Sequence, residues 1–371
     1  MKKFFTIVVV LAIILSGSVA LASEKLIEAS GEYVMDSRLD ETPASATARA
    51  REEAKRAATE KAGVYLQSYS KTIDLVLDTD EVRTVAARLL KIQDESNQVE
   101  VIEKNLLKFT VTIKALVDEL DENILKSMMQ DKETLEELTR KNKELQEKYD
   151  ALNQQMKNYR QEFDTVDDAR KLEIKKEVAR NSEKFSAVDE LNKGNDFSAC
   201  KDYAQALAAY DRAIILDSQL AEAYNNRGII KYELGHFSEA INDYISAISL
   251  KKNYADALNN RGTAYAALNQ FQNATSDFQA ALKINNKSAI YHNNLGSAYL
   301  SQNNSAAAIS EYTLAIELNP NFVDAYYNRA VAYYSQKDLT NALRDMNKAS
   351  ILNPNDPVIR TLKIFYESLV H

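Results

Sequence analysis

The chain has 371 residues, a formal net charge of −8, one cysteine and three histidines. This length is enough for about two or three domains, and an apolar fraction of 45% is enough for packed cores. The acidic balance argues against a surface that binds nucleic-acid phosphates. The single cysteine excludes an intramolecular disulfide, and His236, His292 and His371 are too scattered for a histidine-rich metal site.

Residues 1–22 have the features of a secretory signal peptide. Lys2 and Lys3 precede an apolar run, and Ala20 and Ala22 form the small-x-small pattern that a signal peptidase recognises. The apolar run is short for a membrane span, and no cysteine lies directly after it, which excludes a lipoprotein anchor. We expect cleavage near Ala22 and export to the periplasm or cell envelope. The alternative is an uncleaved signal, which would be the chain's only membrane contact.

Residues 23–117 predict a small α+β domain. Apolar and polar residues alternate over 25–35, which indicates a strand, whereas alanines at helical spacing over 41–70 indicate a helix packed closely against a sheet. A second helix is expected from Thr79 onward. Residues 98–117 alternate again, as expected for a hairpin in a sheet with one solvated face.

This stretch resembles the N-terminal domain of flagellar assembly protein T and a related family of small outer-membrane lipoproteins. The resemblance depends on four motifs: "GEYV", "AREEAKRAA", "AGVYLQSYS" and "KFTVTIKALV". It implies a non-catalytic module that takes part in assembly or adhesion at the cell envelope.

Residues 118–185 contain no glycine or proline and predict a long helix with a coiled-coil repeat. The a positions are Leu135, Asn142, Tyr149, Met156 and Phe163, and the d positions are Leu138, Leu145, Leu152, Tyr159 and Val166. A buried amide at Asn142 favours a dimer in one register. We therefore expect a homodimer through 135–166. The alternative is a single amphipathic helix that folds back on a neighbouring element.

From Ala187 onward the chain divides into five units of 34 residues without an insertion: 187–220, 221–254, 255–288, 289–322 and 323–356. Position 8 is glycine in four units and alanine in the last, position 20 is always alanine, and position 24 is large. This pattern resembles the tetratricopeptide repeat family, whose helical hairpins stack because no unit buries its apolar face alone. The tryptophan usual at position 4 is absent.

The predicted fold is therefore mainly α. It consists of a tetratricopeptide α-solenoid over 187–356, a capping helix over 357–371, a preceding coiled-coil helix and the small α+β domain. Asp356 and Pro357 fit the start of the capping helix.

The repeat resemblance implies a concave groove lined by the first helix of each unit, and asparagines recur there. Amides in such a groove can donate to and accept from the backbone of an extended peptide. Position 6 is always asparagine, and position 5 is asparagine in three units. We expect a protein partner that contributes an extended, neutral or basic segment, whereas the alternative is a local structural role for the amides. The predicted groove residues are Asn192, Asn225, Asn226, Asn259, Asn260, Asn293, Asn294, Asn328, Tyr232 and Tyr334.

A second recurring pair predicts a structural bridge. Units two, three and five each have arginine at position 7 and aspartate at position 23. The other two units have neither the arginine nor the aspartate. This joint occurrence indicates an ion pair between the two helices of one unit. The predicted pairs are Arg227 with Asp243, Arg261 with Asp277, and Arg329 with Asp345.

These patterns favour an exported, non-catalytic adaptor that binds partner proteins in the groove and dimerises by its coiled coil. The alternative is a fixed structural component of an envelope assembly for secretion, adhesion or motility. We expect no catalytic residues, no cofactor, no metal and no nucleic acid. No motif of the sequence supports an enzyme, and the isolated Gly31 and Gly63 do not form a phosphate-binding loop.

Overall fold

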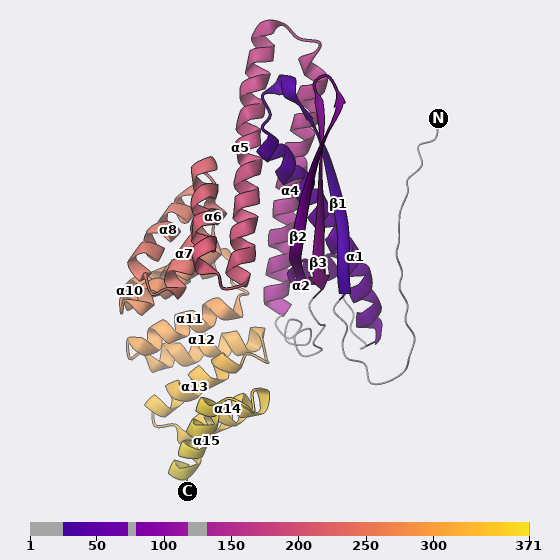
Figure 1. Ribbon diagram of the computed structural model, residues 1–371. Helices are drawn as coiled ribbons and strands as arrows, with labels where there is room; N and C mark the ends of the chain where they lie inside the picture. Colours follow the sequence, from indigo (N-terminus) through magenta and orange to yellow (C-terminus); the bar gives the residue numbers. More distant parts are fainter. Residues whose placement is uncertain (1–24, 73–78, 118–131, 371) are drawn as a thin grey trace, which may run out of the picture.

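The computed structural model describes residues 25–72, 79–117 and 132–370, so the predicted signal peptide lies outside the described residues. A three-stranded sheet and a long helical hairpin stand beside a curved stack of shorter helices (Figure 1). The N-terminal elements are β1 (Lys25–Asp36), the 3₁₀ turn η1 (Ser37–Leu39), α1 (Pro43–Thr72), α2 (Thr79–Leu89), β2 (Leu90–Glu103) and β3 (Leu106–Val117).

The sheet is antiparallel with β3 in the centre, in the order β1-β3-β2. Alternate residues of β3, from Phe109 to Val117, are buried against α1 and α2. Alanines along α1 bring its backbone close to the sheet. At Gly31 the approach is so close that a Cβ atom would overlap the carbonyl oxygen of Ala50. A glycine on β1 is therefore required for this packing.

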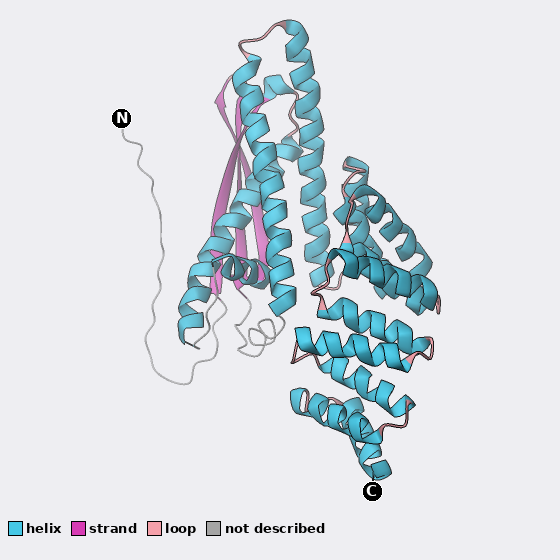
Figure 2. Ribbon diagram, turned by 180° about the vertical axis from the view of Figure 1, so that it is seen from behind, coloured by secondary structure: helices cyan, strands magenta, loops and turns pink. Residues whose placement is uncertain are grey.

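Residues 118–131 of the helix predicted over 118–185 lie outside the described residues, and the described remainder forms two antiparallel helices, α4 (Lys132–Phe163) and α5 (Asp168–Ala199), which are the long hairpin in Figure 2. The chain turns between them, and the side chain of Asp167 accepts from the backbone N–H of Arg170. Asp167 is thus an N-cap, a signal for a helix start that the heptad interpretation overlooked.

The described part of the apolar stripe predicted to join two copies is covered within the chain. Tyr149, Met156 and Phe163 of α4 are buried among residues of α5 and Leu39. Tyr149 meets Phe185 edge-on, with ring centroids 4.8 Å apart, and its hydroxyl donates to the carbonyl of Ala48. These a positions accordingly follow the alternative, a helix that folds back. The side chains of Leu135, Leu138, Asn142 and Leu145 lie outside the described part.

The second half of α5 is the first helix of the solenoid, which confirms the predicted fold class. The remaining helices follow as antiparallel pairs and a final capping helix: α6 (Tyr203–Leu216), α7 (Ala221–Glu233), α8 (Phe237–Leu250), α9 (Ala255–Ala267), α10 (Phe271–Ile284), α11 (Ala289–Ser301), α12 (Ser305–Leu318), α13 (Val323–Ser335), α14 (Leu339–Leu352) and α15 (Pro357–Val370).

In the first four units the two helices cross where the glycine at position 8 faces the ring at position 24. A Cβ atom at Gly262 would lie 2.7 Å from Cε1 of Phe278, closer than real contacts allow. The last unit has Ala330 at position 8, and its partner at position 24 is the slimmer Met346. The choice of glycine therefore follows the size of the side chain that it faces.

The N-terminal domain is docked firmly on the first unit. Arg51 of α1 forms ion pairs with Glu95 of β2 and with Asp189 of α5, each at 2.6 Å. Asn192 donates to Oε1 of Glu52 at 2.9 Å. Because the side chains of Arg51 and Asp189 are mostly buried, this junction fixes the sheet relative to the solenoid.

Candidate functional site: the inner wall of the solenoid

The first helices of the units, namely the end of α5 with α7, α9, α11 and α13, contact one another in succession along one side of the stack. This close succession makes that side the concave one. We call it the inner wall.

Asparagine side chains connect the first helices of the inner wall as a ladder. In units three to five, the Nδ2 atom at position 6 donates to the Oδ1 atom at position 5 of the preceding unit. The bonds join Asn260 to Asn225 at 3.1 Å, Asn294 to Asn259 at 2.9 Å, and Asn328 to Asn293 at 3.0 Å. Asn226 donates instead to Asn195 at 2.8 Å, because position 5 of the first unit is Leu191. The ladder holds each amide in one orientation.

The two rows of predicted groove amides therefore have different roles. Asn225, Asn259 and Asn293 are only 3–8% exposed, so the structure places them in the packing between units and not at the surface of the groove. They are buried because they receive the bonds that join one unit to the next. Position 6 is half-buried in units two to five, so Asn226, Asn260, Asn294 and Asn328 present part of the amide to the groove.

Asn192 also differs from the prediction. It holds position 6 of the first unit, but its amide is bonded to Glu52 of α1. The N-terminal domain thus covers this part of the inner wall, and the accessible groove comprises units two to five.

Of the two predicted groove tyrosines, Tyr232 is half-buried and packs against Phe237, with ring centroids 5.2 Å apart. Tyr334 remains 38% exposed, although its ring stacks on Tyr366 of α15 at 5.1 Å. Tyr232 thus belongs mainly to the packing between helices, whereas Tyr334 offers an aromatic surface at the end of the groove.

Each predicted arginine–aspartate pair is a two-pronged ion pair inside its unit. The Nε and Nη2 atoms of Arg227, Arg261 and Arg329 donate to the two carboxylate oxygens of Asp243, Asp277 and Asp345 at 2.6–3.0 Å. The aspartates are 2–6% exposed. These side chains are therefore committed to the scaffold and do not face a ligand.

Two of the arginines also reach the preceding unit. Nη1 of Arg227 donates to Asp211 at 2.6 Å, and Nη1 of Arg329 donates to Thr313 at 3.0 Å. Both acceptors hold position 25, where the unit before Arg261 has Ile245. The spacing within one unit did not indicate this longer connection, because its two partners belong to neighbouring units.

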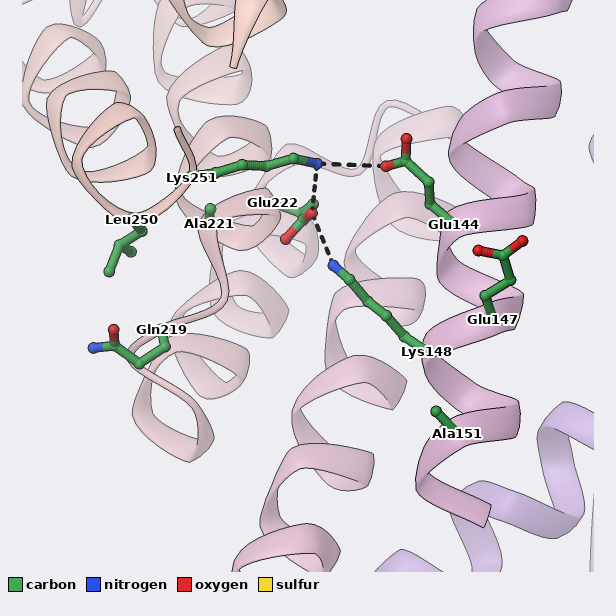
Figure 3. Close-up of a pocket in the computed structure, with 9 residues that line it drawn as sticks. All are labelled: Glu144, Glu147, Lys148, Ala151, Gln219, Ala221, Glu222, Leu250 and Lys251. Carbon is green, nitrogen blue, oxygen red and sulfur yellow. Dashed lines mark hydrogen bonds and ion pairs between the residues drawn. The ribbon is translucent and has the colours of Figure 1, made fainter. Parts of the chain in front are cut away.

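A pocket of about 600 Å³ lies where α4 approaches the second unit (Figure 3). Nζ of Lys148, on α4, lies 3.1 Å from Oε1 of Glu222, at position 2 of the second unit. Lys251 contacts the same oxygen at 3.1 Å and Glu144 of α4 at 3.5 Å. Burial alone would raise the pKa of Glu222, but attraction to Lys148 and Lys251 outweighs burial and lowers it. Sequence spacing gave no signal for this contact, because α4 lies outside the repeats.

The described residues contain no cluster of three or more His, Cys, Asp or Glu side chains arranged to hold a metal ion. None of the helices in the described ranges is both long enough and apolar enough to span a bilayer.

Family models identify the repeats. Models of the tetratricopeptide repeat match residues 198–258, 255–288 and 323–356, and a further TPR repeat model matches residues 296–337. These units are therefore tetratricopeptide repeats, which are generally protein-binding scaffolds and are typically non-catalytic. A comparison with curated proteins finds no match.

Several solved structures resemble the solenoid. YrrB, described as a TPR protein with an unusual peptide-binding site, is 26% identical with a TM-score of 0.42, over 51% of this chain and 96% of its own. MamA is 23% identical with a TM-score of 0.41, over 45% and 92% of the two chains. TTC0263, a thermophilic TPR protein of Thermus thermophilus, is 21% identical with a TM-score of 0.42, over 48% and 98%.

Proposed function

We propose that the protein is an exported, non-catalytic adaptor whose inner wall, over units two to five, holds an extended segment of a partner protein. The observation that carries this proposal is the row of half-buried amides at Asn226, Asn260, Asn294 and Asn328, which present part of each amide to the groove. These amides recur once per unit on the concave side.

The ladder supports binding rather than opposing it. A carboxamide has two N–H donors and an acceptor oxygen with two lone pairs. The ladder uses one N–H of each position-6 amide, and at Asn226 also the oxygen, which accepts from Asn225 at 3.1 Å. Half or more of the capacity remains for a peptide backbone. Because the amides are already held in place, binding costs little additional side-chain entropy.

The N-terminal domain is then a rigid base that orients the groove. The Arg51–Asp189 and Asn192–Glu52 contacts attach it to the first unit. A location at the cell envelope is proposed on the signal-like residues 1–22 and on the resemblance of residues 23–117 to envelope modules.

Dimerisation through 135–166 is not part of this proposal. Tyr149, Met156 and Phe163 would have to leave the apolar cluster that they form with α5 before they could meet a second copy. Exposing three large apolar side chains is unfavourable. We therefore propose that one chain presents one groove.

A pull-down from envelope extracts tests the adaptor function. Ala267 and Ser301 are exposed at position 13 of α9 and α11, near the ends of first helices. The double variant Ala267→Arg/Ser301→Arg should lose the partner, because it adds bulk and positive charge to the inner wall. The matched control Ser276→Arg/Ser310→Arg alters exposed residues of the second helices α10 and α12 and should retain it. Circular dichroism would verify that both variants fold.

The alternative, a fixed component of an envelope assembly, predicts a different result. The partner would then be stoichiometric, would resist dissociation by competing peptide, and would be retained by both double variants. Equal retention by the inner and outer variants would thus contradict the adaptor proposal.

A further inference from the structure

The pocket between α4 and the second unit contains a row of alternating charges. The row runs from Glu144 through Lys251 and Glu222 to Lys148, with N–O distances of 3.5, 3.1 and 3.1 Å (Figure 3). Lys148 is separated from Glu222 by 74 residues and belongs to a helix that is not part of any repeat. A lysine from outside the solenoid therefore forms an ion pair with a carboxylate of the groove.

Glu222 is the first of several groove carboxylates at the same repeat position. Position 2 is also acidic in the third and fifth units, at Asp256 and Asp324. Asp256 accepts from the hydroxyl of Tyr291 at 2.5 Å, and Asp324 is exposed. No position-2 residue of the five units is basic. Charge complementarity therefore favours a partner segment that carries lysine or arginine.

The Lys148–Glu222 contact differs in strength from the rest of the junction. The side chains of Arg51 and Asp189 are 13% and 7% exposed. Lys148 is 53% exposed and Glu222 is 26% exposed, so solvent screens their attraction. Lys148 can consequently leave Glu222 without disturbing the docked domain.

We infer that the pocket at Glu222 is a subsite for a basic side chain of the partner, and that Lys148 occupies this subsite until the partner displaces it. The inference depends on the proposed function, because it names the chemistry of the segment that the groove holds. In the free protein, Lys148 and Glu222 form the contact that a lysine of the partner makes in the complex. The helix α4 therefore competes for the start of the groove.

Fluorescence anisotropy with a defined probe tests the inference. The probe is a labelled ten-residue peptide of alternating lysine and serine, and a glutamate–serine peptide serves as the charge control. Lys148→Ala should bind the lysine peptide about two- to fivefold more tightly than wild type, the range expected when a weak exposed ion pair no longer competes. Lys143→Ala, an exposed lysine of the same helix outside the pocket, should bind like wild type.

Removing the carboxylate completes the test. Glu222→Gln should weaken binding, and Lys148→Ala/Glu222→Gln should behave like Glu222→Gln alone, because Lys148 acts only through that carboxylate. Equal affinity of wild type and Lys148→Ala would overturn the inference, as would tighter binding of the glutamate peptide or no binding of the lysine peptide to any variant. The pull-down with Ala267→Arg/Ser301→Arg decides the proposed function separately, since it alters units three and four and leaves the pocket at Glu222 unchanged.

Discussion

Asn260 donates from Nδ2 to Oδ1 of Asn225, 35 residues earlier, across a distance of 3.1 Å. This bond connects two first helices of neighbouring units, and equivalent bonds follow at the next two boundaries. One row of asparagines is thus buried as acceptor, while the next row is held at the surface of the groove. In the recurring asparagine pair, the residue at position 5 is structural, whereas the residue at position 6 can face a partner.

Removing a buried acceptor should destabilise the solenoid. Asn259→Ala leaves the Nδ2 group of Asn294 without its acceptor, and we expect the free energy of unfolding to fall by about 1–3 kcal/mol. Urea unfolding followed by circular dichroism measures this change. Asn242→Ala, at an exposed position of α8, is the control and should change stability by less than about 0.5 kcal/mol. Equal effects of the two variants would argue against the ladder.

The glycines at helix crossings should not tolerate a methyl group. Gly262→Ala places a Cβ atom 2.7 Å from the ring of Phe278, so we expect a loss of about 1–3 kcal/mol by overpacking. Gly63→Ala in α1 is the matched control, because the nearest atom, Cγ1 of Val82, would lie 3.4 Å away. That variant should be neutral or more stable by up to about 1 kcal/mol, since alanine favours helix. The midpoint temperature of thermal unfolding should therefore fall for Gly262→Ala and stay the same or rise for Gly63→Ala.

The arginine–aspartate pairs should behave as coupled residues. Arg261→Ala leaves the carboxylate of Asp277 buried without its partner, and we expect a cost of about 2–4 kcal/mol. Arg261→Ala/Asp277→Ala should therefore lower the free energy of unfolding by much less than the sum of the two single variants. A double-mutant cycle measures this difference. The exposed pair Arg140 with Glu144 is the comparison, and its coupling should be below about 0.5 kcal/mol. Simple additivity at Arg261 and Asp277 would contradict the geometry.

The junction between the N-terminal domain and the solenoid should weaken in acid. Burial alone would raise the pKa of Asp189, but attraction and hydrogen bonds from Arg51 and Lys193 outweigh it and lower the pKa. A carboxyl whose folded pKa is lowered stabilises the fold above its unfolded pKa of about 3.9, and this contribution is lost as pH falls through the lower folded value. Unfolding of wild type and Asp189→Asn, measured from pH 7 downward, should therefore converge below about pH 4. A difference that stayed constant over this range would oppose the assignment.

The protein should be a monomer in dilute solution. Tyr149, Met156 and Phe163, which the heptad pattern assigned to a dimer seam, are buried within one chain. Sedimentation equilibrium at micromolar concentration should give the mass of a single chain. A stable dimer that dissociates on Phe163→Glu, yet retains the fold, would restore the original coiled-coil prediction.

The repeats were predictable because equivalent positions have equivalent surroundings. Gly262 faces Phe278 as Gly228 faces Tyr244, so the 34-residue spacing is visible in the sequence and predicts the hairpins. The arginine–aspartate pairs were predictable for the same reason. Each pair lies within one unit, and the same spacing occurs in three units.

The contacts that α4 and the N-terminal domain make with the solenoid each occur once, and they join residues that are distant in the sequence. Arg51 and Asp189 are 138 residues apart, and Lys148 and Glu222 are 74 apart, so no period marks either pair. The heptad spacing of Tyr149, Met156 and Phe163 was correct for a buried stripe, but spacing alone does not distinguish a second chain from the chain's own α5. The resemblance of residues 23–117 to envelope modules stays a prediction.

Site-specific photo-crosslinking in intact cells would show which face of the solenoid contacts a partner protein. A photoreactive phenylalanine analogue at Ala267 or Ser301 would report what lies on the inner wall, and the same residue at Ser276 or Ser310 would report the second helices. If the inner wall binds the partner, one protein is captured from the first two positions and not from the last two, and the crosslinked peptide is an extended segment. Capture from the second helices alone, with none from the inner wall, would contradict it.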